Sequence, residues 1–86
     1  MSKKYKLYLD LKNSKKGRKF EELVSLLRKY GFVVDERSGK GSHCPVKHEK
    51  YPDLYWTLSR KRPMSVFHVS KVVKLVEEVM DREGLR

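Results

Sequence analysis

The chain contains a single cysteine, Cys44, so no disulfide bond can form within it. It also lacks the roughly 20 continuous apolar residues that cross a bilayer, and no apolar run follows the opening "MSKK" as a secretion signal would require. We therefore expect a cytoplasmic protein that does not enter a membrane. A chain of 86 residues forms one domain, too small for a deep pocket, so any active site should be a shallow surface.

Acidic residues are scarce, since 11 Asp and Glu stand against 21 Lys and Arg, which gives a net charge of +10. The sequence pI is near 9.9. Such a surface favours polyanionic partners, namely RNA, DNA or an acidic protein, although a charged surface can also serve solubility alone. The charge is segregated, because Asp10 is the sole acidic residue up to Lys19 whereas acidic residues gather between Glu77 and Glu83. This segregation favours a polyanionic partner.

The N-terminal part of the chain predicts a strand followed by a helix. In "YKLYLDL", from Tyr5 to Leu11, apolar and polar residues alternate with the period of a half-buried strand. A basic loop follows, and from Phe20 to Tyr30 the apolar residues fall at helical spacing. Gly31 stands where a left-handed C-terminal cap favours a residue without Cβ. We therefore divide the chain into a basic extension with a strand, residues 1–19, and a domain, residues 20–86.

The rest of the domain predicts three strands and a second helix. "FVVDE", "SHCPVKH" and "LYWTLS" are rich in β-favouring residues and are separated by the turn "RSGKG" and the loop "EKYPD". In "VFHVSKVVKLVEEVM", helical periodicity after the expected N-cap Ser65 outweighs the strand preference of valine. The predicted fold is α+β, a three-stranded antiparallel sheet with two helices on one face (α-β-β-β-α), plus an extra N-terminal strand. The other face of the sheet is expected to stay open.

The stretch "GKGSHCPVKH" brings together residue types that can act on a phosphate. Strand alternation puts Cys44 on the core side and His43 on the open face. An unperturbed histidine has a pKa of about 6.5, so His43 could move a proton while the 2′-hydroxyl of RNA attacks the adjacent phosphorus. Cations and the N–H groups of a Gly-rich turn can hold the phosphate. The expected RNA-binding residues are Lys40, Ser42, Lys47, Arg60, Lys61 and Arg62.

Two other kinds of site would use residues of this stretch, the first together with His68 from the last predicted helix. One is a metal site built from His43, Cys44, His48 and His68, and the other is a nucleophilic Cys44 paired with a histidine. Zinc requires about four convergent ligands, and alternation sends His43 and Cys44 to opposite faces. This alternation depends on a regular strand, and Pro45 could interrupt it. Proline has no N–H to donate to a neighbouring strand, and a bulge that compensated for this would change which residues share a face. We expect no metal and no cofactor, with Cys44 in the core.

A helix ending in "LLRKYGF", a turn leading into "GSH", a third strand containing "TL" and a last helix ending near "GL" resemble the HicA family of toxins from bacterial and archaeal toxin–antitoxin pairs. The resemblance covers Phe20 to Leu85. It implies a fold similar to the double-stranded-RNA-binding domain, cleavage of messenger RNA without a metal, and a HicB-like antitoxin as partner. It also implies that the "GSH" histidine, here His43, is catalytic. The chain departs from the family at "TLSRKRP", where the family often shows a histidine in a "VP-x-H" pattern.

Two alternatives to a messenger-RNA-cleaving toxin follow from the same features. The missing second histidine is compatible with a non-catalytic RNA-binding module. A protein-interaction module would use "YKLYLDL" to add a strand to the sheet of a partner or of a second copy, which would make a homo-oligomer. The outward member of the pair Tyr55 and Trp56 could stack on an unpaired base. "SKKGRK" is either a phosphate-binding arm or a linker.

Overall fold

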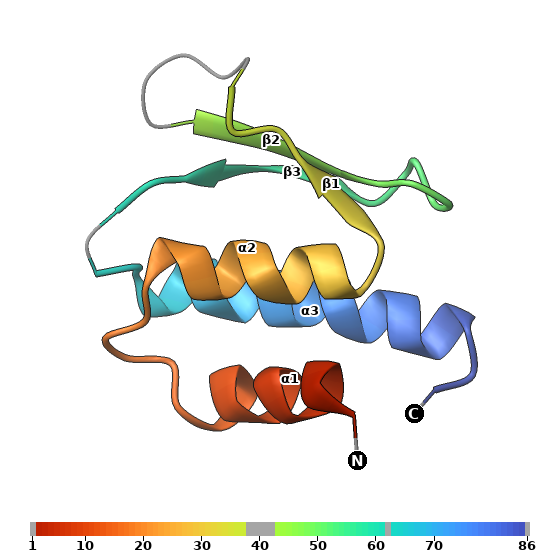
Figure 1. The fold of residues 1–86 in the computed structure, drawn as a ribbon, viewed down its shortest axis with the longest axis horizontal. Coiled ribbons are helices and arrows are strands. Elements are labelled where there is room, and N and C mark those ends of the chain that lie inside the picture. The colour runs from red at the N-terminus through yellow and green to blue at the C-terminus, as the bar shows by residue number, and fades with distance from the viewer. Residues whose placement is uncertain (1, 38–42, 62, 86) are drawn as a thin grey trace.

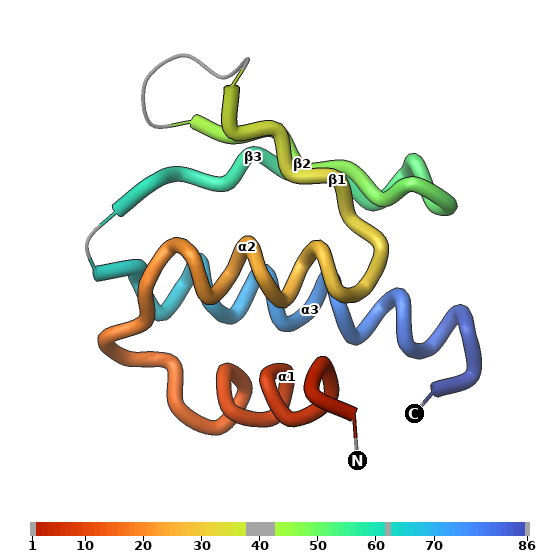
Figure 2. Tube along the Cα trace, viewed as in Figure 1, coloured from red at the N-terminus to blue at the C-terminus, as the bar shows by residue number. Residues whose placement is uncertain are grey.

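A computed structural model describes residues 2–37, 43–61 and 63–85. The fold is α+β, with an antiparallel sheet in the order β1-β2-β3. Figure 1 shows three layers, because α2 and α3 cover one face of the sheet and α1 lies on the far side of these two helices. The same path is traced as a tube in Figure 2. The elements are α1 (Lys3–Asn13), α2 (Phe20–Lys29), β1 (Phe32–Val34), β2 (His43–His48), β3 (Tyr55–Ser59) and α3 (Val66–Arg82).

The two predicted helices and three predicted strands of the domain are confirmed. Helix α3 begins after its N-cap Ser65, whose side chain accepts the backbone N–H of His68. The helical periodicity of its sequence predicts one buried stripe, made of Val69, Val72, Val73, Val76, Val79 and Met80, and the helix buries a wider arc than this because Leu75 is also buried. The reason is the layering, because α1 and α2 both pack against α3. In the part of the chain that the structure describes, no helix is long and apolar enough to cross a membrane.

The predicted N-terminal strand is wrong, because this segment is helix α1. Ser2 caps the helix by accepting the N–H of Tyr5 at 3.3 Å. As a strand, this segment would place Tyr8 with Lys6 and Asp10 on the polar side, yet Tyr8 is only 2% exposed and packs in the core with Leu11. Tyr5, Tyr8 and Leu11 recur every third residue, which is a helical spacing. The segment also has no β-branched residue, and its lysines and leucines favour helix.

Helix α1 belongs to the same hydrophobic core as the other helices. The hydroxyl of Tyr8 donates to Oε2 of Glu77 at 2.6 Å, and Nζ of Lys12 lies 3.1 Å from the same oxygen. Since residues 5–11 are helical and packed against α3, they have no strand to add to another sheet. The homo-oligomer expected through an N-terminal strand therefore loses its basis.

Strand β2 is regular, so the alternation argument holds. Its residues pair continuously with β3 from His43 opposite Ser59 to Lys47, and its burial alternates without a break. The carbonyl of Pro45 accepts the N–H of Asp35 at 3.0 Å. Because the N–H and C=O of one strand residue point to the same side, the nitrogen of Pro45 also faces Asp35, beyond the end of β1. The N–H that Pro45 lacks would therefore point beyond the last residue of β1. The strand loses no hydrogen bond within the β1–β2 pairing, and it needs no bulge.

His48 is a buried structural residue that joins the end of α2 to β2. The residue is 5% exposed, and Nδ1 of its ring accepts the backbone N–H groups of Lys50 at 3.0 Å and Tyr51 at 3.1 Å. Since Nδ1 accepts, Nε2 carries the proton and donates to the carbonyl of Tyr30 at 2.8 Å. Gly31 has a φ of 89°, which confirms the expected left-handed cap. A Cβ there would lie 2.8 Å from Nε2 of His48, so the position also lacks space.

Candidate nucleic-acid interface

The structure places His43 on the face of the sheet that no described element covers, which we call the open face. His43 is exposed at the start of β2, with Ser59 of β3 as its register partner. Lys47 lies on the same face, four residues further along the strand, opposite Tyr55. An exposed imidazole and a lysine therefore share a surface that a polymer such as RNA can approach. The open face consists of Val33, His43, Pro45, Lys47, Tyr55, Thr57 and Ser59.

Tyr55 is the outward member of the aromatic pair on β3. Its side chain is 69% exposed, whereas Trp56 is half-buried on the helix side of the sheet. The ring of Trp56 packs on His68 of α3, with 5.5 Å between ring centroids. A phenol ring with an open surface beside Lys47 can stack on an unpaired base.

Arg60 and Lys61 follow β3 directly, but they differ in their surroundings. Nη2 of Arg60 lies 3.2 Å from Oε1 of Glu36, and the guanidinium lies over the ring of Phe20, 4.9 Å from its centroid. The Arg60 side chain nevertheless stays 44% exposed. Lys61 is exposed, and the ion pairs among the described residues do not include it. A phosphate would therefore compete with a carboxylate for Arg60 but could bind Lys61 directly.

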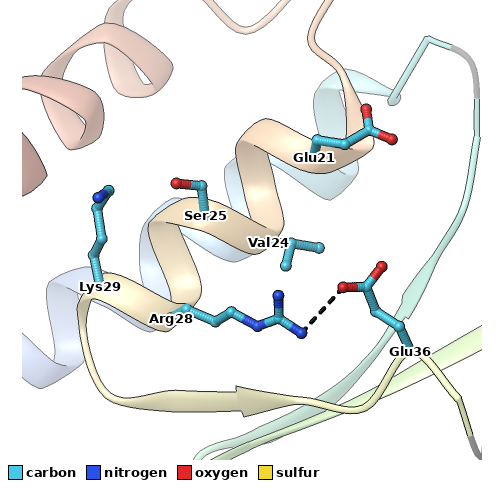
Figure 3. Close-up of a pocket in the computed structure, with 6 residues that line it drawn as sticks. All are labelled: Glu21, Val24, Ser25, Arg28, Lys29 and Glu36. Carbon is cyan, nitrogen blue, oxygen red and sulfur yellow. Dashed lines mark ion pairs between the residues drawn. The ribbon is translucent and has the colours of Figure 1, made fainter.

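The same Glu36 also pairs with α2. A shallow depression of about 420 Å³ lies beside it. Figure 3 shows Arg28 pointing toward Glu36 there, and the two form an ion pair at 3.0 Å. Arg28 also donates to the carbonyl of Val34 at 3.0 Å, so it fastens α2 to the end of β1. This depression mixes acidic and basic side chains and contains none of the residues that the sequence singled out. We interpret the ion pair between Arg28 and Glu36 as a structural contact and not as part of a binding site.

The predicted site residues fall into three groups. His43 and Lys47 share the open face, four residues apart on β2, while Arg60 and Lys61 lie just past the strand end at which His43 sits. Lys40, Ser42 and Arg62 lie outside the described residues.

The other candidate ligands do not converge with His43. Cys44 is 1% exposed and lies in the core, and His48 is bonded to backbone groups on the helix side. His68 lies on α3, where its Nδ1 contacts the hydroxyl of Ser65; burial and the charge of Lys61 lower the pKa of His68. Within the described ranges, no three His, Cys, Asp or Glu side chains gather so that they could hold a metal ion. The metal site and the nucleophilic cysteine therefore gain no support.

Sequence reasoning missed one neighbour of this region. The N–H of Met64 donates to the carbonyl of Arg18 at 2.9 Å, which brings the α1–α2 loop beside the β3–α3 connection. Lys19 and Lys61 consequently line one depression of about 440 Å³. The basic composition of "SKKGRK" was the available signal, but nothing in the local sequence shows which other segment that loop meets.

No protein-family model, curated protein or solved structure matches this chain significantly. The α+β class, with three antiparallel strands and three helices in the described part, rests on the structure itself. The resemblance to HicA toxins stays a prediction from the sequence motifs.

Proposed function

We propose that the chain is a cytoplasmic toxin of the HicA type that cuts messenger RNA without a metal and is silenced by a HicB-like antitoxin. Its α-β-β-β-α part then corresponds to a double-stranded-RNA-binding-domain-like fold, with α1 added to the far side of the helices. The observation that carries the proposal is the exposed imidazole of His43 on the open face, beside the hydroxyl residue Ser59 and between the cations Lys47 and Lys61.

The chemistry needs few parts. The 2′-hydroxyl of RNA attacks the adjacent phosphorus, the bond from phosphorus to the 5′-oxygen breaks, and a 2′,3′-cyclic phosphate forms. His43 takes the proton from the 2′-hydroxyl as general base or supplies one to the leaving 5′-oxygen as general acid, a role typically worth 10²–10⁴ in rate. Lys47 lies about 13 Å from His43 along β2 and Lys61 lies two residues past Ser59, so the two lysines hold neighbouring phosphates and position the strand at His43. No step requires a deep pocket, which suits a small domain with a flat surface.

A non-catalytic RNA-binding module is the second candidate, and one observation favours it. Cleavage requires that one proton is removed and another supplied, yet His43 is the one histidine on the open face within the described ranges. His48 is buried with both ring nitrogens engaged, and His68 packs on Trp56 on the helix side. The binding module would use the same cations and aromatic ring without the chemistry.

The test is cleavage of single-stranded RNA by the purified protein in excess chelator. We expect cut products with 2′,3′-cyclic phosphate ends. The same RNA with a 2′-deoxyribose at the cut position should bind equally but stay intact at that bond, because the attacking hydroxyl is missing. Binding without cutting would favour the module, whereas cutting of the deoxy-substituted bond would exclude 2′-hydroxyl attack.

A further inference from the structure

The α1–α2 loop lies at the same end of the molecule as the start of β2 and the end of β3, at the level of the helices (Figure 1). Arg18 anchors this loop, since Nη1 and Nη2 bond to the carboxylate of Asp10 at 3.0 and 2.9 Å and Nη1 bonds to Glu22 at 2.9 Å. The hydrogen bond from Met64 to the Arg18 carbonyl then fixes the loop to the β3–α3 connection. The bond to Asp10 raises the pKa of Arg18, and its charge is used within the protein.

Two lysines face outward from this junction. Lys19 and Lys61 line a depression whose other walls are formed by Gly17, Arg18, Phe20, Glu21 and Pro63, which we call the Lys19–Lys61 groove. Both lysines are exposed, and the ion pairs of the described residues include neither. Glu21 is the one acidic residue of the groove, so the groove carries net positive charge.

Lys19 occupies a position where it does not help the fold. It is the N-cap residue of α2, where Ser, Thr, Asp or Asn is preferred, and its side chain makes no capping hydrogen bond to the orphan N–H groups. A cation at this end also opposes the helix dipole. The carboxylate of Glu22 caps the helix instead, by accepting the N–H of Lys19 at 2.9 Å. A residue that is unfavourable for its own helix but exposed in a basic groove points to a role in binding.

Lys61 connects the groove to the strand end at which His43 lies. Ser59 is the register partner of His43, and the chain runs from Ser59 through Arg60 to Lys61. Two extended residues span about 7 Å, so Lys61 lies close enough to hold a phosphate next to the one at His43. Lys19 and Lys61 outnumber Glu21, the single carboxylate of the groove. A phosphate backbone, which carries one negative charge per nucleotide, therefore fits the groove by charge.

We propose that the Lys19–Lys61 groove is a second RNA-binding surface, in which the two lysines hold phosphates of the single strand whose scissile bond lies at His43. This inference takes its substrate class from the function proposed above. The N-terminal segment thus contributes to substrate binding through the loop that follows α1, and Arg18 acts as a positioning residue that keeps Lys19 beside Lys61.

The experiment measures binding of a short single-stranded RNA with 2′-O-methyl riboses, which cannot be cleaved by 2′-hydroxyl attack, across a series of salt concentrations. The double variant Lys19→Gln/Lys61→Gln is compared with Lys3→Gln/Lys6→Gln, which removes the same charge from exposed lysines of α1. Each phosphate contact to a single strand contributes a slope of about 0.7 to log Kd against log salt. We expect the groove variant to lose about 1.4 from the slope and on the order of tenfold in affinity, with the control close to wild type.

The inference is overturned if the groove variant and the α1 control show the same slope, or if the wild-type protein does not bind this RNA. The melting temperature shows whether the variants are folded. It should stay unchanged or rise in Lys19→Gln, because the substitution removes a cation from the helix N-terminus. Failure of the nuclease proposal looks different. In that case the groove variant still loses affinity and slope relative to the control, while the wild-type protein leaves ordinary RNA uncut.

Discussion

Replacement of Gly31 by alanine tests how α2 is joined to the sheet. Gly31 has a φ of 89°, and a Cβ would lie 2.8 Å from Nε2 and 3.1 Å from Cε1 of His48. The imidazole cannot move aside freely, because it donates to Tyr30 and its ring packs on Phe32 and Tyr51 at centroid distances of 4.8 and 4.9 Å. Gly31→Ala should therefore strain the backbone and displace a buried, fully bonded ring.

The expected cost follows from two contributions. A residue other than glycine in the left-handed region costs about 1–2 kcal/mol. Displacement of His48 weakens at least one buried hydrogen bond, and leaving a buried polar group unpaired costs about 1–3 kcal/mol. Together these predict a loss of about 2–5 kcal/mol, a large share of the 5–15 kcal/mol by which domains are usually stable.

Gly17→Ala is the matched control. Gly17 has a φ of 70°, but a Cβ there would meet no atom within 4 Å, so only the backbone cost of about 1–2 kcal/mol applies. Urea unfolding followed through the fluorescence of the single tryptophan, Trp56, measures both variants. Equal losses in Gly31→Ala and Gly17→Ala would refute the contact between Gly31 and His48 as the reason for the glycine.

Two further predictions concern residues outside the proposed chemistry. Cys44→Ser should lower the free energy of unfolding by about 1–3 kcal/mol, because it buries a hydroxyl in the core. RNA cleavage should stay near the wild-type rate. Loss of cleavage at unchanged stability would instead give Cys44 a chemical role. Burial and Lys61 lower the pKa of His68 in the folded state, so the unfolded chain binds its proton first as the pH falls. The free energy of unfolding should therefore decrease below about pH 6.5. His68→Gln should remove this part of the decrease when the unfolding free energy is measured down to about pH 5. Identical pH profiles of variant and wild type would contradict the assignment to His68.

The elements of the domain could be predicted because each has one clear period. Helix α2 shows a single apolar stripe, and the burial of β2 alternates as its sequence does. The segment "YKLYLDL" fits both a period of two and a helical spacing, so its periodicity does not decide, and its composition favours a helix only weakly. The decision depends on contacts that are distant in sequence, such as the bond from Tyr8 to Glu77, 69 residues away. Local patterns cannot contain that information.

The candidate site also has one part that the sequence predicts and one part that it does not. The outward position of His43 follows from strand alternation, since the donor that Pro45 lacks falls beyond the end of β1. The ion pair between Arg60 and Glu36 and the approach of Lys19 to Lys61 could not be predicted. Both depend on which loops meet at the end of the molecule, and that is set by the packing of the three helices.

The central claim is that His43 moves a proton during RNA cleavage, and the single-turnover cleavage rate of His43→Ala in chelator tests it most directly. We predict a rate that falls by about 10²–10⁴, the usual contribution of an acid or base. Affinity for the 2′-O-methyl RNA and the melting temperature should stay near wild type, because His43 is exposed on the open face. Cleavage by His43→Ala at the wild-type rate would contradict the claim and assign the chemistry to another residue.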